Sequence, residues 1–170
     1  RLDTGTSGLV ILAKTPAALA QMTELIRTRA VQKEYLCVTL GAPARPQAEL
    51  RGFLVKNAKR GTVRVTAAAQ RGAKEIITRY ETLCKSGALA LLRVQLVTGR
   101  THQIRVHMAS IGHPLLGDQV YGPKKCPFSK LVGQTLHART LGFIHPRTNE
   151  YIEVNAPLPD YFLNLLEKLN

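Results

Sequence analysis

The chain has 170 residues, of which 45% are hydrophobic, and its 24 Lys and Arg against 11 Asp and Glu give a formal net charge of +13. This length fits a single domain with an ample core, and no apolar run is long enough to span a bilayer. A positive surplus of this size favours a polyanionic partner, because every phosphate contacted releases condensed counterions. We therefore expect a nucleic acid as partner and no membrane.

The basic residues are concentrated in two regions. Residues 51–79 contain eight Lys or Arg and a single acid, Glu75, and the stretch between residues 118 and 150 contains five and no acid. A merely solubilising surface would mix both signs, and neither region has the pattern of a basic amphipathic helix that binds anionic membranes. Lys59 and Arg60 are expected to lie in a basic hairpin that contacts RNA.

The three cysteines, Cys37, Cys84 and Cys126, are odd in number and far apart. This spacing matches neither a disulfide framework nor a zinc site, and reduced thiols are typical of a cytoplasmic protein. The chain begins without Met and inside a motif. We expect residues 1–170 to form one domain of a monomer, truncated at its N-terminus.

The first half of the chain predicts mainly strands. The apolar run 8–13 predicts a short buried strand. Thr15 and Pro16 predict a helix start, as cap and first helical residue, and the helix is expected to run to about Arg29. One face of this helix is expected in the core, with Leu19, Met22, Leu25 and Ile26. Further strands are predicted at 33–40, 48–55, 62–68, 75–83 and 88–97.

The second half predicts two more helices. Thr101 is expected to cap a helix that ends at Ile111, because Gly112 and then Pro114 follow, and Ile104, Met108 and Ile111 are expected to face inward. A loop at 117–134, strands at 136–144 and 151–154 and a helix at 160–169 complete the chain. The predicted fold is α+β, with a mixed, largely antiparallel sheet flanked by helices.

Two stretches carry candidate chemistry. The segment 1–8 places the carboxylate of Asp3 near Arg1 before a sharp turn. Around the start of the predicted helix lie Arg100, His102 and Arg105. An arginine so close to a core face is costly unless it meets a carboxylate or a phosphate, and Asp3 is the natural candidate for Arg105.

The histidines do not indicate a metal site. His102 and His107 are five residues apart, whereas a zinc-binding helical pair is four apart with a Glu beside the first His. Ser7 is not in the Gly-x-Ser-x-Gly context of a hydrolase nucleophile. We expect neither a metal nor a cofactor.

Several motifs occur in order along the whole chain. They are Arg1-Leu2-Asp3-x-x-Thr6-Ser7-Gly8, Lys33-x-Tyr35, residues 98–107, residues 112–122, Leu136-His137-Ala138, Phe143-x-His145-Pro146 and Ala156-Pro157-Leu158-Pro159. Together these blocks resemble the RluA-class pseudouridine synthases. A His usually precedes the first block in that family and is absent here, and Cys37 stands where a small residue such as Ala is expected.

The resemblance implies isomerisation of uridine in ribosomal or transfer RNA to pseudouridine, with the target base flipped out of its helix. Asp3 would be the catalytic aspartate and Arg105 its cationic partner. Tyr35 would stack on the uracil and help to remove the C5 proton. Arg1 would fill the vacated place in the RNA stack, and Arg100 and His102 would contact the RNA.

Each of these residues also has an ordinary interpretation. Asp3 alone could serve an Asx-turn, Tyr35 could be a core tyrosine, and Asp118, in a Gly-Asp turn, is expected to be structural. The main alternative function is a non-catalytic RNA-binding or ribosome-associated module. A metal-dependent nuclease or deaminase would need carboxylate clusters or Cys and His ligand spacing. The joint presence of Asp3, Tyr35 and Arg105 favours the enzyme.

Overall fold

The computed structural model describes residues 1–57, 61–125, 131 and 133–167, and the statements below concern these residues. Lys59 and Arg60, predicted as RNA contacts, lie outside them. None of the helices in this part of the chain has the length and hydropathy of a membrane span. The elements are β1 (Ser7–Gly8), α1 (Pro16–Arg27), β2 (Gln32–Leu40), β3 (Gln47–Asn57), β4 (Thr62–Thr66), β5 (Lys74–Ser86), β6 (Leu89–Leu96), α2 (Gln103–Ser110), β7 (Leu136–Ile144), β8 (Tyr151–Asn155) and α3 (Asp160–Leu166).

All strands belong to one sheet in the order β1-β7-β2-β6-β5-β3-β4, with β8 also paired to β7. The pair β1–β7 is parallel, and the other pairs are antiparallel. The expected α+β fold with a mixed, largely antiparallel sheet is therefore confirmed.

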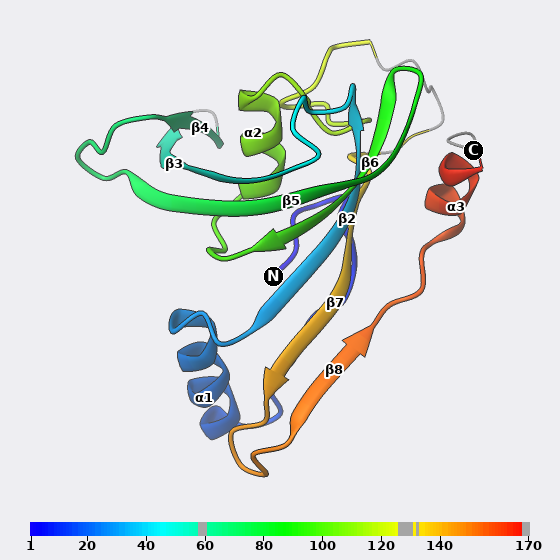
Figure 1. The fold of residues 1–170 in the computed structure, drawn as a ribbon. Coiled ribbons are helices and arrows are strands. Elements are labelled where there is room, and N and C mark those ends of the chain that lie inside the picture. Colours follow the sequence, from blue (N-terminus) through cyan, green and yellow to red (C-terminus); the bar gives the residue numbers. More distant parts are fainter. Residues whose placement is uncertain (58–60, 126–130, 132, 168–170) are drawn as a thin grey trace.

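The two faces of the sheet bury different helices. Alternate residues of a strand point to opposite faces, and in β6 Ala90 and Leu92 belong to the apolar cluster that includes Ile104 of α2. Leu89 and Leu91 belong instead to the cluster that includes Phe162 of α3. Figure 1 shows α2 inside the curve formed by β3, β5 and β6, with α3 well apart from it. The sheet thus separates two cores.

The β3–β4 hairpin predicted from the sequence is present. Its strands pair from Phe53 with Thr66 to Asn57 with Thr62. Leu54 of the hairpin packs with Val106 of α2. The hairpin is thus anchored to the helix that carries the predicted site residues.

Two expectations for the N-terminal region are wrong. The strand predicted at 8–13 is limited to Ser7–Gly8, and Val10 and Leu12 are 51% and 85% exposed. Helix α1 has the expected Thr15 cap, whose Oγ1 accepts from the N–H of Ala18 at 3.2 Å, but none of its residues is buried. The helix lies at the far ends of β2 and β7 (Figure 1), and of the face expected in the core Leu19 and Ile26 are exposed, whereas Met22 and Leu25 are half-buried.

Helix α2 also starts differently from the prediction. Thr101 is not its cap. His102 takes that position with φ 54°, and its side chain makes no capping bond. Residues 103–108 are all buried, and Ile111 is only half-buried. The curved sheet encloses the helix on several sides, so its polar residues need partners inside the protein. Helix α3 begins at Asp160 as predicted, and its predicted end falls outside the described residues.

Candidate active site

The loop that carries Asp3 is fixed by hydrogen bonds. The backbone N–H of Thr6 donates to the carbonyl of Asp3 at 3.0 Å, and Gly5 supplies the positive φ of 81° that this turn requires. The buried side chain of Gln134 reaches the loop from the segment before β7. Its Nε2 donates to the carbonyl of Thr4 at 2.8 Å and to Oγ1 of Thr6 at 3.0 Å. The loop therefore holds Asp3 in one place.

The end of the same loop is fastened to β7. Oγ of Ser7 lies 2.8 Å from Nδ1 of the buried His137. At Gly8, with φ 108°, a Cβ atom would collide with the backbone of Ala138. Only glycine permits this approach of the two backbones, so Gly8 sets how closely the Asp3 loop lies against the sheet.

The guanidinium of Arg105 is held by Asp118. Nε and Nη2 of Arg105 donate to the two carboxylate oxygens of Asp118 at 2.7 and 2.9 Å, and Asp118 is completely buried. Its Oδ1 also accepts from the backbone N–H groups of Val120 and Tyr121, at 2.9 and 3.0 Å. Burial alone would raise the pKa of Asp118, but the bonds from Arg105 and these N–H groups lower it below its ordinary value.

Asp3 forms a second, longer ion pair with the same guanidinium, through Nη1. Nη1 of Arg105 lies 3.7 Å from Oδ2 of Asp3, whose side chain is 21% exposed. The expected ion pair is thus present, but it is the longer of two. Asp118, and not Asp3, is the main partner of Arg105, because the turn after Gly117 supplies a carboxylate that the sequence analysis did not pair with it. Arg105 also lies over the ring of Tyr121, at 5.3 Å from its centroid.

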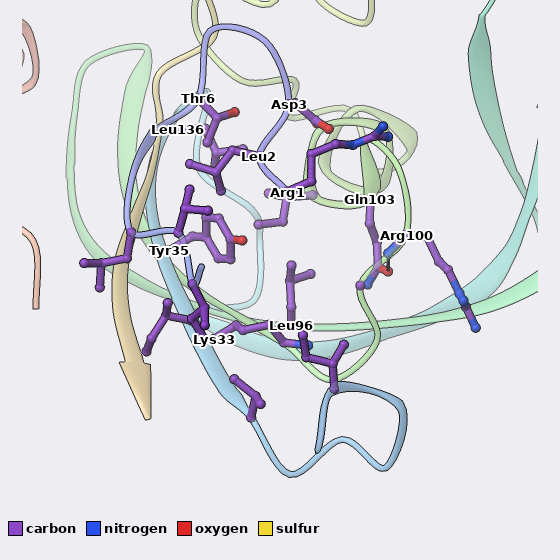
Figure 2. Close-up of a pocket in the computed structure, with 18 of the residues that line it drawn as sticks. Arg1, Leu2, Asp3, Thr6, Lys33, Tyr35, Leu96, Arg100, Gln103 and Leu136 are labelled. Carbon is purple, nitrogen blue, oxygen red and sulfur yellow. Dashed lines mark hydrogen bonds between the residues drawn. The ribbon is translucent and has the colours of Figure 1, made fainter. Parts of the chain in front are cut away.

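Asp3 lines a cavity of about 330 Å³ between the N-terminal loop, β2 and the junction of β6 with α2. This is within the size range of small-molecule sites. Its wall is largely apolar, and Figure 2 shows Leu2, Leu96 and Leu136 around it. Four residues predicted for the site line the cavity: Arg1, Asp3, Tyr35 and Arg100.

Tyr35 is placed by β2, at the centre of the sheet. Its residue partners are Val94 of β6 and Ala138 of β7, and its half-buried ring points into the cavity (Figure 2). Burial, and to a lesser extent the charge of Asp3, raises the pKa of Tyr35 to about 12. The phenol is therefore neutral near pH 7, with a flat face toward the cavity.

A buried amide fixes the mouth of the cavity. Nε2 of Gln103 donates to the carbonyl of Ile77 at 3.1 Å and to Oγ1 of Thr78 at 3.0 Å. Its Oε1 accepts from Oγ1 of Thr98 at 2.9 Å and from the backbone N–H of Arg100 at 3.0 Å. The amide thus makes four bonds, which tie the junction of β6 and α2 to β5.

His102 lies elsewhere. It does not line the cavity, and its Nδ1 is 2.9 Å from the hydroxyl of Tyr121. That hydroxyl also accepts from the backbone N–H of Val63 in the β3–β4 hairpin at 3.0 Å. His102 and Arg105 share a side of α2, as expected, since both contact Tyr121. The backbone of His102 is in the left-handed region that non-glycine residues rarely adopt.

Gln103 and Gln134 were not expected in the site, because an uncharged amide is neither an ion-pair partner nor a nucleophile. A glutamine at the start of a helix expected to pack in the core, directly after Gly-Arg-Thr-His, is a signal that could have identified Gln103, since a buried amide needs four partners. Within the described residues, no three His, Cys, Asp or Glu side chains are grouped closely enough to hold a metal ion.

The fold is similar to two solved human structures. RNA Pseudouridylate Synthase Domain Containing 4 superposes with a TM-score of 0.83 at 26% identity, covering 99% of this chain and 74% of that one. Domain Containing 1 gives a TM-score of 0.80 at 28% identity, covering 94% of this chain and 67% of that one.

The sequence comparisons agree with the structural ones. The sequence model of the family described as RNA pseudouridylate synthase matches residues 1–110, and the chain belongs to this family. It is 39% identical to the uncharacterized RNA pseudouridine synthase YlyB of Bacillus subtilis, over 99% of this chain and 54% of that protein. It is 38% identical to ribosomal large subunit pseudouridine synthase D of Pasteurella multocida, with the same coverage.

The resemblance to the RluA class is therefore confirmed. The chain spans about half the length of the curated relatives it matches.

Proposed function

We propose that the protein isomerises uridine in RNA to pseudouridine, with Asp3 as the catalytic carboxylate. One observation carries the proposal. Asp3 faces a cavity lined by Tyr35 and lies 3.7 Å from Nη1 of Arg105, whose Nε and Nη2 donate to Asp118. A carboxylate held in this way keeps oxygens free for a substrate, while the guanidinium compensates its charge in a partly closed site.

The reaction needs no net change in composition. The N1–C1′ bond of uridine breaks, the uracil turns, and a C5–C1′ bond forms. C5 then loses its proton and N1 gains one. The Asp3 carboxylate would act at the sugar or at the base as the first bond breaks. The cavity would hold the detached uracil close to C1′, which keeps the recombination intramolecular.

Tyr35 and Arg1 would handle the flipped base. The ring of Tyr35 offers a stacking surface, and base–aromatic stacking stabilises a bound base by about 1–3 kcal/mol. Loss of the C5 proton restores the conjugation of the ring, and the neutral Tyr35 hydroxyl would relay it, accepting the C5 proton on its oxygen as it passes its own proton to water. Arg1 lies at the cavity next to Asp3 and would replace the flipped base in the RNA stack.

We propose large-subunit ribosomal RNA as the substrate, with transfer RNA as the alternative. The support is the name of relatives such as ribosomal large subunit pseudouridine synthase D of Haemophilus influenzae, 38% identical over 99% of this chain. The exposed Arg100 at the cavity mouth and the basic β3–β4 hairpin, including Lys59 and Arg60 between its strands, would contact phosphates. His102 would act indirectly, by holding Tyr121.

The test is tritium release from a transcript of bacterial large-subunit ribosomal RNA labelled with [5-³H]uridine, using the full-length protein. Release is expected with the wild type and is expected to vanish with Asp3→Asn. The matched control is Asp160→Asn, which removes an exposed carboxylate of α3 and should release tritium normally. If the wild type binds this RNA without release from it or from labelled transfer RNA, the non-catalytic module is the better account.

A second experiment tests the RNA contacts. Charge reversal at Lys59 and Arg60 should weaken RNA binding, and the slope of log affinity against log salt should fall by roughly two. Lys85→Glu, near the end of β5, is the control. If the RNA affinity and its salt dependence are unchanged, Lys59 and Arg60 do not contact the RNA.

A further inference from the structure

Lys33 lies in the wall of the same cavity and has no acid to pair with. It precedes Tyr35 by two positions on β2, is half-buried, and lines the cavity. Its Nζ approaches the backbone of Gly99, where an added Cβ atom would lie 3.7 Å from it. Among the described residues, none forms an ion pair or hydrogen bond with the Lys33 side chain.

The nearby charges explain why Lys33 remains unpaired. Glu34, the next residue, lies 4.0 Å from Arg93. Glu75 is 3.3 Å from Arg29. Burial, followed by the charge of Arg29, lowers the pKa of Lys33. A partly buried ammonium without a counterion is unfavourable, so the resting cavity has a site that favours negative charge.

The position of this site relative to Asp3 is informative. Figure 2 shows Asp3 and Lys33 on opposite sides of the cavity, with the Tyr35 ring between them, and the Lys33 side chain extends towards Leu96. A uracil stacked on Tyr35 with its sugar towards Asp3 would direct its far edge, which carries carbonyl oxygens, to Lys33. In this pose the Asp3 carboxylate would lie beside the sugar and the Lys33 ammonium beside the uracil, on the two sides of the N1–C1′ bond that breaks.

We infer that Lys33 is a catalytic residue that donates a hydrogen bond to a uracil carbonyl oxygen and stabilises the uracil anion formed when the N1–C1′ bond breaks. The electron pair of that bond goes to the uracil and is shared between N1 and the carbonyl oxygens. It then forms the C5–C1′ bond, after which C5 loses a proton and N1 gains one. Lys33 keeps its own proton throughout. This inference rests on the proposed isomerase activity.

The ordinary alternative is that Lys33 contacts a phosphate of the RNA. The two roles differ in what they affect, because a phosphate contact strengthens binding of any RNA, whereas an anion-stabilising contact matters only as the bond breaks. Fluorine at C5 stabilises the uracil anion by itself. A substrate with 5-fluorouridine should therefore depend less on Lys33 than one with uridine.

The experiment uses the full-length protein and two large-subunit ribosomal RNA transcripts, one made with uridine and one with 5-fluorouridine. Single-turnover conversion of the uridine transcript is followed as pseudouridine, by nuclease digestion and mass-resolved chromatography of the nucleosides. 5-Fluorouridine has no C5 proton to lose, so its C5–C1′ product is followed instead as the rearranged nucleoside that has added water, with the hydroxyl at C6 and the proton at N1. Lys33→Met is expected to lower the rate constant by about 100-fold on the uridine transcript, the size of losing one oxyanion-type donor. The loss on the 5-fluorouridine transcript is expected to be about ten times smaller, and RNA affinity should change little.

Two control variants complete the design. Lys85→Met, which removes an exposed lysine near the end of β5, should match the wild type on both transcripts. Lys33→Arg keeps the positive charge and should retain more activity than Lys33→Met. Activity of Lys33→Arg would also show that a substitution at this position leaves the protein folded.

The inference is overturned if Lys33→Met slows both transcripts equally, weakens binding alone, or has no effect. A wild type that forms no pseudouridine would instead refute the proposed function, and the inference with it.

Discussion

Two carboxylates share one arginine in this protein, and they are used differently. Asp118 is completely buried and accepts two hydrogen bonds from Arg105 and two from backbone N–H groups. Asp3 is 21% exposed and meets Arg105 at 3.7 Å, beyond hydrogen-bond length. The first carboxylate has its bonding capacity filled inside the fold, whereas the second keeps capacity towards the cavity.

The difference shows how a reactive carboxylate can be stabilised by an arginine while its oxygens stay free to contact a substrate. If Asp3 alone compensated Arg105, a close bidentate pair would occupy the oxygens that the substrate needs. Asp118 fixes the direction of the guanidinium, and the ring of Tyr121 packs against it. Arg105 can then influence Asp3 through its charge, at a distance that leaves the oxygens of Asp3 accessible. The comparison predicts separate consequences for stability and for activity.

The largest effect on stability is expected at Asp118. Asp118→Ala leaves the buried Arg105 with only its distant partner, and breaking a buried pair in this way costs about 3–5 kcal/mol. Urea unfolding of the variant measures the loss. Glu24→Ala, which removes the exposed pair with Arg27 on α1, should leave the unfolding midpoint unchanged. A midpoint for Asp118→Ala equal to that of the wild type would contradict the structural role.

The next effect concerns pH and His107. Nδ1 of this buried residue lies 2.9 Å from the hydroxyl of Thr78, and burial lowers its pKa to about 4. Because the unfolded state binds the proton more readily, the free energy of unfolding should be greatest above about pH 6.5. It should fall as the pH drops to about 4, by about 3 kcal/mol in all.

Urea unfolding at several pH values between 4 and 7 measures this dependence. His107→Gln should make the free energy of unfolding flatter over the window. Asp118 contributes separately at lower pH. Its lowered pKa adds stability above its ordinary value near 3.8, and this stability is lost as the pH falls through the lower folded value. An equally steep decline in His107→Gln would show that another group is responsible.

The smallest effect is expected at Gln134, which positions the Asp3 loop. Gln134→Ala removes the two hydrogen bonds to Thr4 and Thr6, and it should cost about 1–2 kcal/mol of stability. Displacement of Asp3 should lower the single-turnover rate about 10-fold with unchanged RNA affinity. Gln70→Ala, in an exposed turn, is the control. A lower affinity at an unchanged rate would indicate that Gln134 serves RNA binding.

The fold was largely predictable where a local pattern decides the structure. Alternating strands, glycine turns and the Thr15 cap predicted the antiparallel hairpins and the start of α1. The face of α1 expected in the core is only partly covered, because an amphipathic pattern indicates which residues prefer burial and not whether another element covers them. The buried strand predicted from the apolar run after Gly8 is absent for the same reason, since only Ser7–Gly8 pair with β7.

The sequence suggested the candidate residues of the site but not how they are arranged. Asp3, Tyr35 and Arg105 came from the resemblance, and the structure brings Asp3 and Tyr35 to one cavity with Arg105 behind Asp3. The pairing of Arg105 with Asp118 depends on how the turn at Gly117 folds over α2, which spacing along the chain does not encode. The cap expected at Thr101 failed because the buried Gln103 amide holds this junction instead.

The most direct test is single-turnover pseudouridine formation by full-length Asp3→Asn at saturating RNA, with its free energy of unfolding determined on the same preparation. The account predicts no pseudouridine, RNA affinity equal to that of the wild type, and stability within about 1 kcal/mol, because Asp118 still pairs with Arg105. Conversion at a rate near that of the wild type would contradict the assignment of Asp3 as the catalytic carboxylate.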